Sequence, residues 1–342
     1  MNKVAVVILS WNCIGYLKMF LGDVVRHSTD NDTIVCVADN GSTDGSPDWV
    51  SENFKDVKLI RLDKNHGFAG GYNIALSRLD ARYFVLLNSD IEVTENWLSP
   101  LIGFMDKNPD VASCQPKIRS FRQKDHFEYA GAAGGFIDKY GFTFCRGRLF
   151  DMTEMDKNQY DDRTDIFWSS GACMVVRSEA WDKCNGFDKD FFAHMEEVDL
   201  CWRFHSSGYR VSYIPESMVY HVGGGVLPYN SELKTYLNFR NNLFLLYKNL
   251  PDNNLHLTLF IRKLFDGVAA AVFLIKGRPG SAKAVWRAHI DYYKSLKSLK
   301  DKRNQVKEMA VLKTYDYLLN KSIVFEFYIK GNKTYNSLRG QN

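Results

Sequence analysis

The sequence predicts an α/β fold in which helices flank a mainly parallel central sheet, followed by a helical extension. Short apolar runs alternate with helical patterns over the first 120 of the 342 residues, a rhythm typical of βαβ units with right-handed crossovers. The runs are apolar on both faces, as in strands that helices cover on either side of a parallel sheet. Beyond residue 225 only helical patterns remain.

The expected elements follow from these patterns in chain order. The first part holds expected strands at 4–9, 33–38, 57–62 and 82–87 and expected helices at 15–27, 46–54 and 70–79. Residues 120–165 are irregular and rich in glycine and aromatic residues, which favours a substrate-facing loop region. Next come a strand at 171–177, a helix at 196–207, strands at 210–214 and 218–221, and helices at 233–249, 255–275 and 281–300.

Composition and charge indicate a folded protein with a basic C-terminal region. The chain is 45% apolar and 25% charged and has a net charge of +4, which is ordinary for a globular protein. Residues 276–342, however, carry 15 Lys and Arg against 5 Asp and Glu. This asymmetry favours contact with an anionic surface, either membrane lipid or nucleic acid, and the alternative is a solvated helical face.

The number and spacing of the cysteines indicate the redox state of the protein's cellular compartment. Their number is odd and they form no CxxC pair, so we expect reduced thiols rather than a disulfide frame or a zinc site. They are Cys13, Cys36, Cys114, Cys145, Cys173, Cys184 and Cys201. The sequence shows no signal peptide, and no apolar run approaches the ~20 residues that span a bilayer. We therefore expect a cytoplasmic protein, free or peripheral on the inner face of the cytoplasmic membrane.

Polar side chains follow three predicted strands at their carboxyl ends, where ligands bind in open α/β sheets. These residues are Ser10 and Asn12, Asp39, and the run Asn88-Ser89-Asp90. Asp39 could accept hydrogen bonds from a base or ribose. Asp90 could hold a divalent cation against a diphosphate, because hard cations prefer oxygen ligands. The alternative at each position is a plain turn with a helix cap.

The run NHGFAGGYN (65–73) follows the third expected strand. Its glycines, Gly67, Gly70 and Gly71, allow close backbone approach, and a helix starts here. This arrangement resembles a phosphate cradle at a helix N-terminus. The run is neither a GxGxxG fingerprint nor a P-loop.

Reactive groups occur in the second half of the chain. Asp199 and Arg203 form an i,i+4 pair typical of a helix surface, but the adjacent Glu196 and Glu197 repel each other. One of the two could face a cleft as a base for a hydroxyl group. His221 precedes three glycines and could complete a metal site with Asp90, although a lone histidine is more often structural.

Taken together, these motifs resemble glycosyltransferase family 2, whose members have the GT-A fold. The matching pieces occur in the family's order between residues 4 and 249: SWN, DNGSTDGS, NHGFAGGYN, NSD, GACMVVR, EEVDLCWR and HVGGG. Each piece is weak, but the ordered set is specific. The motifs are most similar to those of bacterial rhamnosyltransferases of surface-polysaccharide assembly.

The resemblance implies an inverting, metal-dependent hexosyltransferase with Mg²⁺ or Mn²⁺ as its cofactor. Such an enzyme moves a sugar from a nucleoside-diphosphate sugar to a hydroxyl of a glycan or lipid-linked acceptor in cell-envelope polysaccharide synthesis. The implied catalytic domain is 1–225, with a nucleotide-sugar-binding half at 1–120 and an acceptor-binding half at 121–225. A helical, basic region follows at 226–342.

The resemblance also implies roles for single residues. Asp90 and His221 would bind the metal, and Asn88 replaces the first carboxylate of the family's DxD signature as a neutral helper. Glu197 matches the catalytic base, with the choice between Glu196 and Glu197 left open. The nucleotide-sugar site would comprise Leu9, Ser10, Asn12, Asp39, Asn65, Gly70, Gly71, Asn88, Ser89 and Asp90. Trp168 and Gly171 would border the acceptor.

Two other functional classes remain as alternatives. A sugar-phosphate nucleotidyltransferase would need a basic, glycine-rich loop near the first helix, where only Lys18 is basic. A non-catalytic nucleotide-sugar-binding protein would not need the set of Asp90, Glu196, Glu197 and His221. The basic tail lacks a recognisable nucleic-acid motif, so no nucleic-acid partner is expected.

The expected helix at 255–275 has a different character. It is apolar but interrupted by Arg262, Lys263 and Asp266, and basic residues follow it at Lys276, Arg278, Lys283 and Arg287. The combination suits an interfacial helix anchored on anionic lipid. The alternatives are that these helices pack on the catalytic domain or join copies of the chain in a homo-oligomer.

Overall fold

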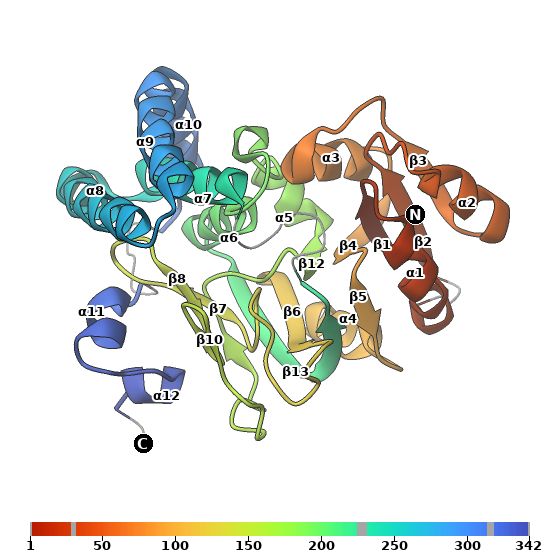
Figure 1. Ribbon diagram of the computed structural model, residues 1–342. Helices are drawn as coiled ribbons and strands as arrows, with labels where there is room; N and C mark the ends of the chain where they lie inside the picture. Colours follow the sequence, from red (N-terminus) through yellow and green to blue (C-terminus); the bar gives the residue numbers. More distant parts are fainter. Residues whose placement is uncertain (1, 29–31, 224–230, 313–317, 341–342) are drawn as a thin grey trace.

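The computed structural model describes residues 2–28, 32–223, 231–312 and 318–340 (Figure 1). Within these ranges the main sheet has nine strands. Their order is β11 (Thr164–Asp165), β13 (Arg210–His221), β6 (Val111–Ser120), β12 (Cys173–Arg177), β4 (Ala81–Asn88), β1 (Asn2–Ser10), β2 (Thr33–Asp39) and β3 (Lys58–Arg61), with β5 (Ile91–Val93) paired to β13. Strands β4, β1, β2 and β3 are parallel, as predicted, whereas β12 runs antiparallel to both β4 and β6.

Helices cover both faces of this sheet. The helical elements before residue 210 are α1 (Ile14–Ser28), α2 (Ser46–Asn53), α3 (Gly67–Leu76), α4 (Leu98–Lys107), α5 (Ser178–Lys183), the 3₁₀ turn η1 (Lys189–Phe191) and α6 (Glu196–Ser206). Successive β1 side chains enter two different cores, with Ala5 and Val7 in one and Val6 and Ile8 in the other. The strands are therefore buried on both sides, which is why they lack an alternating pattern.

The stretch expected to be an irregular loop region contains a second sheet. Its four antiparallel strands are β7 (Gly135–Ile137), β8 (Thr143–Cys145), β9 (Arg148–Leu149) and β10 (Met152–Thr153). Strands of two or three residues are too short to show a period-two pattern. The expectation of a loop was wrong here for that reason. Strand β6 was also missed, because its buried positions include the polar Ser113, Gln115 and Lys117.

The C-terminal region is helical, as predicted, and packs beside α6 (Figure 1). Its helices are α7 (Glu232–Asn249), α8 (Asp252–Ile275), α9 (Pro279–Lys294), α10 (Leu296–Met309), α11 (Ile323–Tyr328) and α12 (Tyr335–Leu338). The expected helix at 281–300 is two helices that meet at Ser295, and the expected strands at 210–214 and 218–221 form the single strand β13. None of the helices in the described chain combines the length and hydropathy needed to span a bilayer.

Candidate active site

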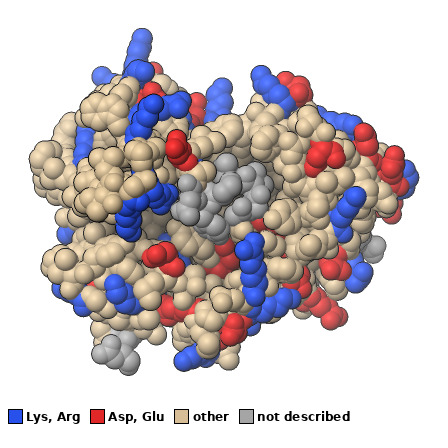
Figure 2. Space-filling view, viewed as in Figure 1, with Lys and Arg blue, Asp and Glu red and all other residues tan. Residues whose placement is uncertain are grey.

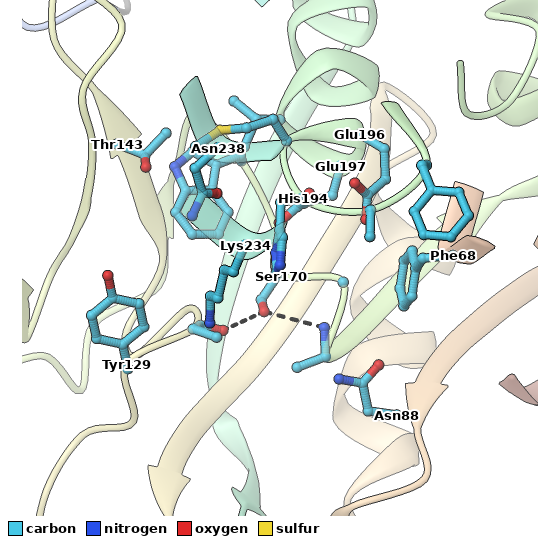
Figure 3. A pocket seen from close by; sticks show the side chains of 18 of the residues that line it. Phe68, Asn88, Tyr129, Thr143, Ser170, His194, Glu196, Glu197, Lys234 and Asn238 are labelled. Atoms are coloured by element: carbon cyan, nitrogen blue, oxygen red, sulfur yellow. Dashed lines mark hydrogen bonds between the residues drawn. The ribbon is translucent and has the colours of Figure 1, made fainter. Parts of the chain in front are cut away.

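A cavity of about 470 Å³ lies at the carboxyl ends of β1 and β4, where open α/β sheets bind ligands. Its walls come from residues 9–90, from residues 129–221 and from the C-terminal helices α7 and α8. Figure 3 shows Glu196, Glu197 and Phe68 on one side of the view, with Tyr129 and Thr143 on the other. Segments far apart in the sequence therefore converge on one pocket.

Asp90 and His221 meet in this cavity. Strand β13 pairs with β5 so that His221 lies opposite Ile91, which brings its imidazole next to Asp90. His221 Nε2 lies 3.2 Å from Asp90 Oδ1 and 3.5 Å from Asn88 Nδ2. All three side chains line the cavity. The predicted juxtaposition of the strand-end triad with this histidine is present.

A third charged residue completes the arrangement. Glu128 Oε2 lies 3.1 Å from His221 Nδ1, and both side chains are buried. Burial lowers the pKa of His221, but the carboxylates of Glu128 and Asp90 outweigh this effect and raise the pKa to about 10. Burial alone would raise the pKa of Asp90. The positive charge of His221 and its hydrogen bond together have the larger effect, so the pKa of Asp90 lies below its usual value. Sequence analysis missed Glu128 because it lies in the irregular stretch, where no pattern marks it.

These residues fit a divalent cation. A carboxylate beside Nδ1 favours a proton on that nitrogen, and a bound cation would take the place of the proton on Nε2. Adjacent ligands of an octahedral ion with bonds of about 2.1 Å lie about 3 Å apart, close to the observed 3.2 Å between Nε2 and Oδ1. Among the described residues no group of three or more His, Cys, Asp and Glu side chains is arranged to hold a metal ion. Asp90 and His221 would thus be the protein ligands, with substrate phosphates and water filling the remaining positions.

The two glutamates begin α6 and line the cavity. Glu196 is buried and Glu197 is partly exposed. Within the described chain, Oε2 of each is buried without a hydrogen-bond partner. Burial raises the pKa of Glu197 to about 7, and burial together with the charge of Glu197 raises that of Glu196 further. The two carboxyls interact, so the charge on Glu197 opposes ionisation of Glu196.

Asp199, in the same motif, has a structural role. Its side chain is fully buried and accepts hydrogen bonds from Arg203 Nε (3.0 Å), Lys248 Nζ (3.0 Å) and Asn249 Nδ2 (2.9 Å). The expected i,i+4 pair with Arg203 is present and lies inside the protein. It joins α6 to α7 instead of facing the cavity.

The loop before α6 is strained and braced. Three of its non-glycine residues have left-handed backbones, namely Phe192 (φ 64°), His194 (φ 69°) and Met195 (φ 72°). Such conformations persist only when the surroundings enforce them. Asn241 on α7 provides that enforcement, because its Nδ2 donates to the carbonyls of Phe191 (2.9 Å), Ala193 (2.9 Å) and His194 (2.7 Å). Helix α7 thus holds the segment that presents Glu196 and Glu197.

The residues expected at the nucleotide occupy two kinds of position. Leu9, Asn65, Asn88, Ser89 and Asp90 line the cavity. Asn12 instead ties two loops together, because its Oδ1 accepts from Thr43 N at 2.8 Å and its own N–H donates to Ser42 Oγ at 3.0 Å. Ser10 is buried, with Oγ 3.1 Å from Cys13 Sγ.

Asp39 and the neighbouring Asn40 shape the same edge. Asp39 is buried and accepts from Ser42 N at 3.2 Å, while its Oδ1 has no hydrogen-bond partner among the described residues. Asn40 lines the cavity and braces the next loop through Asn65 Oδ1 (3.2 Å) and the backbone of Gly67 (3.0 Å). Sequence analysis did not select Asn40 as a site residue.

The phosphate cradle expected at the start of α3 is not present. The first N–H groups of this helix are already bonded, Gly67 N to Asn65 Oδ1 (2.8 Å) and Phe68 N and Ala69 N to the carbonyl of Phe192 (2.7 and 3.2 Å). Gly70 and Gly71 lie inside α3 and do not line the cavity. A Cβ on Gly71 would come within 2.9 Å of Leu9, so this glycine is needed for helix–strand packing.

The expected acceptor residues Trp168 and Gly171 both line the cavity. The ring of Trp168 lies against Gly135, where a Cβ would come within 2.1 Å of it, and its Nε1 donates to Phe136 O at 2.9 Å. This side of the cavity also includes residues that sequence analysis did not select. They are Tyr129, Thr143, Lys234, Asn238, Asn242 and Arg262. Four of the six belong to α7 and α8, whose helical patterns gave no sign of a site.

The His221 motif continues into residues outside the described ranges. Gly224 and Gly225 of HVGGG lie there. The division between a catalytic domain at 1–225 and a helical region at 226–342 stays a prediction, but α7 and α8 contribute side chains to the cavity.

Comparison with known proteins identifies the family. The family described as "Glycosyl transferase family 2" matches residues 5–182, about half of the chain. The chain belongs to this family. Membership confirms the predicted glycosyltransferase class and argues against the nucleotidyltransferase alternative.

Two curated relatives of this glycosyltransferase are rhamnosyltransferases. The N-acetylglucosaminyl-diphospho-decaprenol L-rhamnosyltransferase of Mycobacterium tuberculosis is 26% identical over 224 residues, which cover 60% of this chain and 71% of that protein. Rhamnosyltransferase WbbL of Escherichia coli is 26% identical over 163 residues, which cover 46% of this chain and 61% of that protein. The predicted similarity to this subgroup is confirmed.

Solved structures confirm the GT-A fold. GalNAc-T7 with UDP, GalNAc and Mn²⁺ matches with a TM-score of 0.56 at 15% identity, covering 72% of this chain and 48% of that one. The mannosyltransferase PcManGT of Pyrobaculum calidifontis with GDP-Man and Mn²⁺ matches with a TM-score of 0.53 at 15% identity. That match covers 92% of this chain and 88% of the other.

Proposed function

We propose that this glycosyltransferase is an inverting, metal-dependent hexosyltransferase. It transfers a sugar from a nucleoside-diphosphate sugar to a hydroxyl of a glycan or lipid-linked acceptor in bacterial cell-envelope polysaccharide synthesis. The observation that carries the proposal is that Asp90, His221 and Glu197 line the same cavity.

Glu197 is the general base. Its buried Oε2 has no competing hydrogen bond within the described chain, and its pKa of about 7 leaves a large ionised fraction near neutral pH. The ionised carboxylate takes the proton of the acceptor hydroxyl as that oxygen attacks the anomeric carbon. Burial and the charge of Glu197 raise the pKa of the neighbouring Glu196, which disfavours ionisation of both groups together.

Asp90 and His221 would hold a Mg²⁺ or Mn²⁺ ion, and such an ion would supply positive charge for the departing nucleoside diphosphate. Asn88 contributes an amide at 3.5 Å from His221 and adds no charge. The base and the leaving group act on opposite sides of the sugar, so one displacement inverts the anomeric configuration. Some residues expected at the nucleotide do not line the cavity and would support the nucleotide site through the residues that do. They are Ser10, Asn12, Asp39, Gly70 and Gly71.

The acceptor occupies the part of the cavity bordered by Trp168 and Gly171. The mycobacterial relative is named for transfer to a sugar carried on a decaprenyl diphosphate, which supports a lipid-linked acceptor here. The enzyme would then work from the cytoplasm at the inner face of the cytoplasmic membrane.

The test is donor turnover. The chain is incubated with Mn²⁺ and a panel of UDP-, GDP- and dTDP-sugars with a polyprenyl-diphosphate-linked sugar, and the released nucleoside diphosphate is measured. We expect release with one donor class, dependence on Mn²⁺, and loss in both Glu197→Gln and Asp90→Ala. Near wild-type release by both variants would contradict the assigned site.

A further inference from the structure

Helix α8 has an inverted distribution of side chains. Its buried positions are Leu255, Thr258, Leu259, Arg262 and Asp266, which include two charged residues. Its solvent side is apolar, with Leu257 (66% exposed), Phe260 (61%), Leu264 (57%), Val268 (63%) and Ile275 (85%). A helix on the surface of a water-soluble protein normally has the opposite arrangement.

The buried polar side of α8 is well satisfied. Arg262 Nε donates to Asp266 Oδ1 at 2.8 Å, Arg262 also bonds to Asn242, and His289 Nε2 lies 3.0 Å from Asp266 Oδ2. These bonds tie α8 to α7 and α9. The orientation of α8 is therefore fixed, and its apolar side has no route into the core.

The exposed apolar positions form one continuous stripe. At 100° per residue, residues 257, 260, 264, 268, 272 and 275 fall within a 120° arc, opposite the buried positions. Helix α9 packs against α8 and adds exposed aromatic groups, Trp286 (70% exposed) and Tyr293 (53%). An isolated exposed leucine needs no explanation, but a row of this length marks a binding surface.

The charges around the stripe identify its partner. Between residues 253 and 290 the one acidic residue is Asp266, and it is buried. The exposed charges on this stretch are those of Lys276, Lys283 and Arg287. In Figure 2 the lobe at the upper left, where Figure 1 places these helices, is mostly tan with blue groups and few red ones.

We infer that the α8–α9 surface docks onto a bilayer that contains anionic phospholipid. Apolar side chains would enter the acyl boundary, the lysines would contact the headgroups, and Trp286 would sit at the interface. A second copy of the chain fits less well, because a symmetric contact would bring the same cations together. The opposite side of α8 lines the cavity through Arg262, so docking would hold the active site beside the bilayer.

Vesicle binding tests this inference without any sugar substrate, so its result is independent of the proposed transfer reaction. The full chain is sedimented with vesicles of equal parts phosphatidylglycerol and phosphatidylcholine, and with phosphatidylcholine alone, at low and high salt. We expect binding to the anionic vesicles that weakens at high salt. Equal binding to both vesicles, or no binding to either, would overturn the inference.

Variants locate the surface. Leu264→Glu and Phe260→Glu should each abolish sedimentation, whereas Met19→Glu on α1, at the same 57% exposure as Leu264, should not. Lys276→Ala and Lys283→Ala should each weaken binding about fivefold. Unchanged thermal melting would show that the variants fold. The alternative outcome is that the wild type does not bind vesicles and is a dimer in light scattering, and that Leu264→Glu is a monomer. This result would assign the surface to a second copy of the chain.

A second measurement does not depend on altering the stripe. Lipids brominated near the headgroup should quench fluorescence of the wild type more than that of Trp286→Phe, because Trp286 would enter the interface. Equal fractional quenching in the two proteins would contradict the placement of α9.

Discussion

Glu128 Oε2 lies 3.1 Å from His221 Nδ1, on the opposite side of the imidazole from Asp90. The carboxylate thus orients the ring and sets its tautomer, as acidic residues behind metal-binding histidines commonly do. We predict that Glu128→Gln weakens Mn²⁺ binding about 10- to 100-fold. Titration of Mn²⁺ in the presence of a nucleoside diphosphate measures this directly. Glu92→Gln is the control, because Glu92 lies on the neighbouring β5 and pairs with the exposed Lys124; equal affinity in the two variants would remove Glu128 from the site.

Replacing the general base should slow chemistry more than binding. We expect Glu197→Gln to lower kcat by about 10²- to 10⁴-fold and to leave the KM for the donor nearly unchanged. Glu196→Gln should cost much less, because burial and the charge of Glu197 both raise the pKa of Glu196 and so oppose its ionisation. Single-turnover rates of the two variants decide between the residues, and a larger loss in Glu196→Gln would reverse the assignment.

The pKa of Glu197 predicts a pH profile. Because this carboxyl has a pKa of about 7 and acts in its ionised form, kcat should rise with pH and level off above about 7. The folded protein binds the Glu197 proton more tightly than the unfolded chain, whose ordinary pKa is 4.5. This group therefore lowers stability as pH rises from about 4.5 through 7. Glu197→Gln should remove that part of the pH dependence of the free energy of unfolding, and an unchanged slope would contradict it.

Asn241 should act as a positioning residue. Its side chain donates to three carbonyls of the loop before α6, so Asn241→Ala leaves buried acceptors without a donor, at about 1–3 kcal/mol. We expect a lower kcat with an unchanged affinity for the nucleoside diphosphate. Asn253→Ala, on the exposed part of α8, serves as the control. A loss of stability without a change in kcat would limit Asn241 to a structural role.

Asp199 should matter for stability rather than chemistry. It is buried between Arg203 and Lys248, and removing one partner of a buried ionic cluster costs about 3–5 kcal/mol. Asp199→Ala should therefore lower the free energy of unfolding by that amount in chemical denaturation. A stable variant without transfer activity would show that Asp199 takes part in the reaction.

The sequence alone predicted much of the fold. Strands β1, β2 and β4 are buried on both faces along most of their length, and their apolar runs are nearly continuous, whereas the edge strand β3 is largely exposed. Strand β6 has no such apolar run, because its buried positions include the polar Ser113 and Gln115. Their side chains are satisfied by hydrogen bonds with the Ser169 hydroxyl and the backbone N–H of Ser170. The second sheet was not predicted, because its strands of two to three residues are too short to show a pattern.

The residues of the candidate site that belong to sequence motifs could be predicted. Asp90, Glu197 and His221 follow recognisable motifs, and the structure brings them to one cavity. Asn241 and Arg262 could not be predicted in the same way. They lie on helices whose side chains reach the site only through tertiary packing, and a polar residue on an amphipathic helix looks the same whether it faces water or a ligand.

The carbonyl of Phe192 links the donor side of the pocket to the catalytic loop. It accepts from Phe68 N and Ala69 N at the start of α3. Phe192 lies two residues before the strained His194–Met195 pair. Helix α3 and the loop that precedes Glu196 and Glu197 are thus joined through their backbones. A substitution that shifts the start of α3 would therefore also shift the residues that precede the candidate base.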